Sequence, residues 1–73
     1  MTAELTIEEG KAVVSVDHGI NIPYIRVQRI ATRKLNQYRK EHRLMAPWAL
    51  VDRQTRDSGG YIVSTDYTYV QMR

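Results

Sequence analysis

The stretch that decides the fold is residues 25–43, IRVQRIATRKLNQYRKEHR, in the middle of a 73-residue chain. Counted at 100° per residue, one stripe holds Val27, Ala31, Leu35, Tyr38, His42 and Met45, with Ile30 at its border. Pro23 suits the start of a helix, where its missing N–H is not needed. Pro47 stops a helix and favours an extended residue before it. We therefore predict one long amphipathic helix, of about five turns, within residues 23–45.

Positive charge is concentrated on this predicted helix. Residues 24–45 carry seven cations and one carboxylate, a net charge of +6, whereas residues 1–23 carry four carboxylates and one lysine, a net charge of −3. Such asymmetry is expected of a surface that meets an anionic partner. The candidate partner-binding residues lie opposite the apolar stripe or on its flank: Arg26, Arg29, Arg33, Lys40 and Arg43.

The C-terminal region, residues 48–73, is predicted to form a β-hairpin with further strand. Gly59 and Gly60 permit the positive φ angles of a hairpin turn between two runs of β-branched and aromatic residues. Tyr67–Val70 suits a pleated surface. We expect Trp48 to cover the core, because tryptophan is usually largely buried.

The N-terminal region, residues 1–22, is an acidic segment with two interpretations. The valine-rich run at 12–16 favours a strand, whereas the spacing of Thr6 and Glu9 is that of a capping box and would start a helix. Gly10 and three valines weaken that helix, so we favour the strand. The predicted fold is a single α+β domain with one long basic helix packed on a small antiparallel sheet.

Few residues in the chain support catalysis. There is no cysteine, the only histidines are His18 and His42, and no serine lies in a nucleophile motif. We therefore expect neither an enzyme nor a metal or other cofactor. No apolar run approaches the roughly 18 residues of a membrane span, and the apolar stripe lacks the bulky residues that membrane-surface binding needs. We expect a soluble intracellular protein with no membrane partner.

Two binding functions remain open. A winged helix-turn-helix would use residues 6–18 as its first helix, Tyr24 onward as its recognition helix, and Arg53 and Arg56 as wing contacts to phosphates. Protein docking needs only arginines along one rigid helix, which pair with acidic side chains. We favour docking, and contact with nucleic acid remains possible.

The helix segment IRVQRIATRKLNQYRKEHRL and the hairpin segment LVDRQTRDSGGYIV, in a chain of this length, resemble the small transcription regulators of lytic Xanthomonas phages. The resemblance implies binding to the large subunits of host RNA polymerase in the host cytoplasm. It also implies inhibition of initiation and promotion of antitermination, without catalysis. Because bacterial RNA polymerase is acidic overall, a basic helix would be steered toward it. We expect the chain to act as a monomer.

Overall fold

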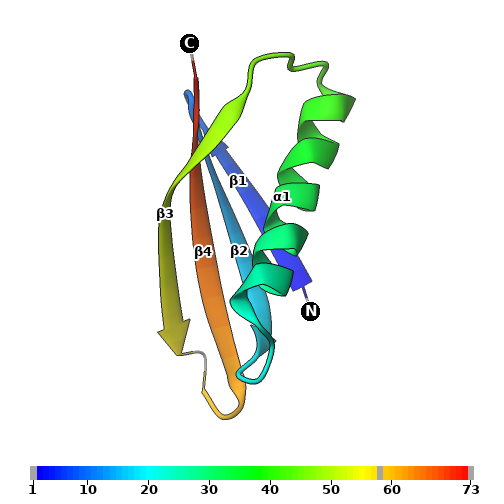
Figure 1. The fold of residues 1–73 in the computed structure, drawn as a ribbon. Coiled ribbons are helices and arrows are strands. Elements are labelled where there is room, and N and C mark those ends of the chain that lie inside the picture. The colour runs from blue at the N-terminus through cyan, green and yellow to red at the C-terminus, as the bar shows by residue number, and fades with distance from the viewer. Residues whose placement is uncertain (1, 58, 73) are drawn as a thin grey trace.

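Four antiparallel strands form one sheet, and a helix covers part of one face (Figure 1). The computed structural model describes residues 2–57 and 59–72. Its elements, in chain order, are β1 (Thr2–Glu8), β2 (Lys11–Gly19), α1 (Tyr24–Glu41), β3 (Trp48–Asp57) and β4 (Ile62–Gln71). The strand order is β1-β2-β4-β3, so the two hairpins meet at β2 and β4. The prediction of a small α+β domain with an antiparallel sheet is confirmed.

The N-terminal region is a hairpin. The predicted strand at 12–16 is confirmed and forms the middle of β2, while β1 runs through the position of the expected capping box. Ala12, Val14 and Val16 are fully buried and alternate with more exposed residues, as a strand with one covered face requires. The first helix of a winged helix-turn-helix, expected at 6–18, is therefore wrong for this chain.

The helix has the predicted start and about the predicted five turns, but it ends slightly early within the predicted region 23–45. It ends at Glu41, and not near Arg43, because the chain turns there into a Schellman motif. The Leu44 N–H donates to the Arg39 carbonyl at 2.9 Å, the Arg43 N–H donates to the Lys40 carbonyl at 3.4 Å, and Arg43 takes a φ of 54°. Glycine normally occupies this left-handed position, and its absence hid the helix end from the sequence pattern.

Replacing Arg43 with glycine should stabilise the fold. A left-handed conformation costs an L-residue about 1–2 kcal/mol, and glycine avoids this cost. Because glycine has more conformational freedom in the unfolded chain, part of the stability gained is lost again. We expect R43G to raise the free energy of unfolding by about 0.5–1 kcal/mol, measured by urea denaturation. R43A removes the same charge but keeps the conformational cost, so it should show no such gain. Equal stability of R43G and R43A would contradict the role of Arg43 as the helix C′ residue.

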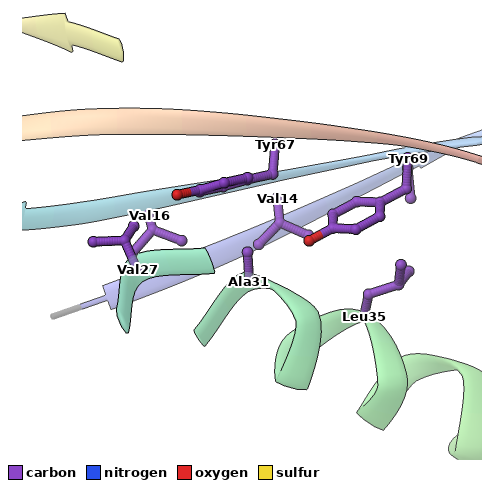
Figure 2. Close-up of a cluster of buried hydrophobic side chains, with 8 residues drawn as sticks. Val14, Val16, Val27, Ala31, Leu35, Tyr67 and Tyr69 are labelled. Atoms are coloured by element: carbon purple, nitrogen blue, oxygen red, sulfur yellow. The ribbon is translucent and has the colours of Figure 1, made fainter. Parts of the chain in front are cut away.

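The core lies between α1 and the central strands (Figure 2). Its fully or nearly fully buried side chains are Ala12, Val14, Val16, Val27, Ala31, Leu35, Tyr67 and Tyr69. The first part of the predicted helix stripe is thus confirmed, whereas Met45, past the helix end, is 90% exposed. Trp48 packs against this cluster, as expected of a residue that covers the core.

Burial of two core tyrosines makes the fold sensitive to alkaline pH. Burial raises the pKa of Tyr67 above its ordinary value of 10.0, although the charge of Arg53 partly opposes the rise. Burial also raises the pKa of Tyr69, while its hydrogen bond with Thr32 acts in the opposite direction. A pKa raised on folding gives stability that is complete below the unfolded pKa and is lost as pH rises through the folded pKa.

We therefore expect the free energy of unfolding to fall as pH increases above about 10. The Y67F/Y69F variant cannot ionise at these positions, and its stability should fall less steeply over the same range. Urea denaturation at a series of alkaline pH values measures both slopes. Identical slopes would show that the two buried hydroxyls do not couple ionisation to unfolding.

The helix lies off the centre of the sheet. It packs mainly on β2 and contacts β1 and β4 less. The backbone of α1 does not come close to the backbone of β3. Figure 1 shows β3 on the side of β4 away from the helix. This placement leaves the outer face of α1 and the helix-facing side of β3 open to partners.

Candidate docking face

The outer face of α1 carries exposed cations in a row. Arg26, Arg29, Arg33 and Lys40 are all exposed, and the helix turns them away from the buried Val27, Ala31 and Leu35. At a rise of 1.5 Å per residue, this row extends about 21 Å along the helix. We call these four residues the basic face.

The basic face has no counter-ion among residues 2–57 and 59–72. The ion pair that forms within these residues is Arg56–Asp66, at 3.1 Å. Arg39, on the flank of the helix, donates instead to the Asn36 side-chain oxygen at 3.3 Å. The four guanidinium and ammonium groups of the basic face are therefore available to an external partner.

Arg43, the fifth candidate, follows the helix end. It remains close to the basic face, because Lys40, Arg43 and Met45 line the same shallow hollow. The structure therefore brings Arg43 together with the C-terminal part of the basic face and separates it from Arg26. The expectation that one helix carries all five residues is therefore wrong, because the helix ends in the Schellman motif before Arg43.

The two hairpin arginines point to opposite faces of the sheet. Arg53 is paired in register with Tyr67, on the helix side, and its guanidinium lies 5.0 Å from the centre of the Tyr24 ring. Arg56 is paired in register with Ser64 and forms its ion pair with Asp66 on the other face. They therefore do not form the common phosphate-binding wing that we considered from the sequence.

The open face of the sheet is polar, and two of its carboxylates, Asp17 and Asp66, accept hydrogen bonds from neighbouring side chains. Ser15 donates a hydrogen bond to Asp66 at 2.7 Å, and Ser64 donates one to Asp17. Tyr67 and Tyr69 point away from this face and into the core, so they do not form an aromatic RNA-binding surface there. These contacts depend on strand register, which sequence reasoning did not give.

Both histidines contact other side chains of the fold, and the ring of His42 lies against that of Tyr38, with 4.2 Å between the ring centres. His18 is buried between strands, where its Nε2 lies 2.7 Å from the Thr65 hydroxyl and its Nδ1 lies 3.0 Å from the Gly19 carbonyl. Because a carbonyl only accepts, Nδ1 donates, and both ring nitrogens are used within the fold. Within the described part of the chain, no group of three or more His, Asp or Glu side chains is placed to hold a metal ion.

Among the residues that the structure describes, no helix has both the length and the apolar character needed to cross a membrane. Comparison of the chain with protein-family models, with curated proteins and with solved structures finds no match.

Proposed function

We propose that the chain is a non-catalytic transcription regulator that docks on host RNA polymerase through the basic face of α1. The observation that carries this proposal is the row of four exposed cations that have no counter-ion in the described part of the chain. Arginine presents a planar set of donors that matches carboxylates, so such a row suits an acidic protein surface. The resemblance to small phage regulators supplies the identity of the partner.

Helix stability accounts for the cations at the C-terminal end of α1, because Arg39 and Lys40 lie in the last turn, where positive charge favours the helix dipole, but it does not account for the cation at the start. The first turn of the helix has no acidic residue, and Pro23 provides no side-chain cap. Arg26 lies in this turn, where a positive charge opposes the helix dipole at a cost of about 0.3–1 kcal/mol. A docked acidic surface would offset this cost, which supports a role in binding.

Docking alone is sufficient for regulation. A small adaptor that binds one state of polymerase more tightly than another shifts the population toward that state. Inhibition of initiation and antitermination both follow from such a shift, without an active site on the adaptor. Electrostatic attraction to an acidic enzyme would also raise the rate of association.

In vitro transcription with purified host RNA polymerase tests the proposal. We expect added chain to reduce initiation at a host promoter and to increase read-through at a terminator placed downstream of a preformed elongation complex. An R26E/R29E variant should lose both effects together, because it alters the same face. If wild-type chain leaves both transcript yields unchanged, the proposed function is wrong.

A further inference from the structure

The helical layer over the sheet is incomplete. Four strands spaced about 4.8 Å apart make a sheet wider than one helix of about 10 Å diameter can cover. Because α1 lies on the β1–β2 side, the helix-facing side of β3 remains open. Leu50 is 38% exposed there, and Arg53 and Thr55 are also exposed.

A shallow groove, lined by side chains of α1 and of residues 43–45, follows the flank of the helix on the β4 side. The hydroxyl groups of Thr32 and Tyr69 lie 3.2 Å apart, which identifies this flank of the helix. The first part of the groove, about 390 Å³, is lined by Ile25, Gln28, Arg29, Thr32, Arg33 and Asn36. Asn36 also lines a second hollow of about 650 Å³, with Arg39, Lys40, Arg43, Leu44 and Met45, so the two parts adjoin.

The charge of this lining is of one sign. Two arginines line the first part of the groove, two arginines and a lysine line the second, and neither part is lined by a carboxylate. The groove therefore complements an acidic ligand. Removing water from its cations costs free energy, and this cost is offset only when carboxylates or phosphates take the place of the water.

Apolar side chains at the two ends favour a protein over a nucleic acid. Ile25 is 53% exposed at one end, and Met45 is almost fully exposed at the other. A phosphate backbone offers nothing apolar for these side chains, whereas an amphipathic helix presents aliphatic residues at intervals along one face. From Ile25 to Lys40 the helical part of the groove is about 22 Å long, the length of a helix of about 15 residues.

We propose that this groove binds an acidic amphipathic α-helix of the partner protein, laid beside α1 and over the open side of β3. The aliphatic face of that helix would contact Ile25, Leu50 and Met45, and its carboxylates would meet the groove arginines. This helix-in-groove mode rests on the proposed function, because it names the chemistry of the polymerase element that the basic side of α1 recognises.

A peptide titration followed by amide chemical shifts tests the groove directly. The probes are two peptides of about 20 residues with identical leucine and glutamate content, one with the leucines on a single helical face and one scrambled. We expect the amphipathic peptide to bind about tenfold more tightly, with shifts at Ile25, Thr32 and Leu50. Equal binding of the two peptides, absence of binding, or shifts on β1 and the open sheet face would each overturn the proposal.

Variants separate this inference from the proposed function. I25S and L50S should each weaken binding of the amphipathic peptide and of RNA polymerase about tenfold without changing the salt dependence. I62S removes an equally exposed aliphatic side chain from β4 and serves as the control, which should bind as wild type. If I25S and L50S leave polymerase binding unchanged, the proposed groove binding is wrong and the proposed function stands. If the chain binds the amphipathic peptide but not polymerase, the proposed function is wrong and the groove binding stands.

Discussion

Replacing Tyr67 with alanine should remove about 3–5 kcal/mol from the free energy of unfolding, which is the cost of deleting a large buried aromatic ring. Tyr67 is 0% exposed and is the largest fully buried side chain among the described residues. A domain of this length is expected to hold about 4–11 kcal/mol in total, so the variant should lose a large fraction of its stability. Thermal and urea unfolding followed by circular dichroism measure the change.

Tyr61 provides the matched control. It lies in the same hairpin but is 82% exposed, so Y61A should change stability by no more than about 0.5 kcal/mol. Y67F should fold normally, because it keeps the ring and loses only a long hydrogen bond to the Tyr24 carbonyl. An unfolding midpoint of Y67A equal to that of Y61A would show that β4 does not pack under α1 as described.

Reversing two charges on the basic face should weaken binding to host RNA polymerase about 100-fold. Arg33 and Lys40 are exposed and form no ion pair with any residue that the structure describes, so R33E/K40E should leave the fold intact. Each reversal replaces an attraction with a repulsion, which is worth about 1–3 kcal/mol at a docked surface. Binding kinetics to surface-immobilised polymerase, measured at several salt concentrations, should show a lower association rate for the variant. That rate should also depend less on salt than the wild-type rate does.

The control for this prediction is K11E. Lys11 is exposed on the open face of the sheet, and its reversal changes the net charge as much as either single reversal, R33E or K40E. We expect K11E to bind polymerase within about twofold of wild type, whereas R33E and K40E each lose about tenfold. Equal losses for K11E and R33E would mean that total charge, and not the basic face, governs binding.

The helix and the C-terminal hairpin follow from local sequence patterns. Pro23 marks the helix start, the 3.6-residue stripe selects Val27, Ala31 and Leu35 as its buried side, and two glycines form the hairpin turn. In that turn Gly59 and Gly60 have φ values of 93° and 63°, as predicted, and Ser58 lies outside the described residues.

The first strand was accessible from the sequence but was not recognised. Ala3, Leu5 and Ile7 alternate with polar residues, which is the pattern of a strand with one covered face. The capping-box spacing of Thr6 and Glu9 instead indicates a helix that begins in the same segment. In the fold, pairing of Leu5 with the buried Val14 outweighs that local signal.

The faces of the hairpin arginines were not accessible from local patterns. Pairing of β4 with β2, which inserts it between β2 and β3, is a long-range choice. A register shift between Leu50 and Asp52 then places Arg53 on the same side as Leu50. Without that irregularity, simple alternation along the strand would put Arg53 on the opposite side.

The most direct test of the docking account is a pair of binding titrations at physiological salt, one with purified host RNA polymerase and one with generic duplex DNA. The account predicts tight, saturable binding to polymerase and weak DNA binding that is lost as salt increases. Tight DNA binding that persists in salt, with no affinity for polymerase, would contradict it and identify the basic face as a nucleic-acid surface.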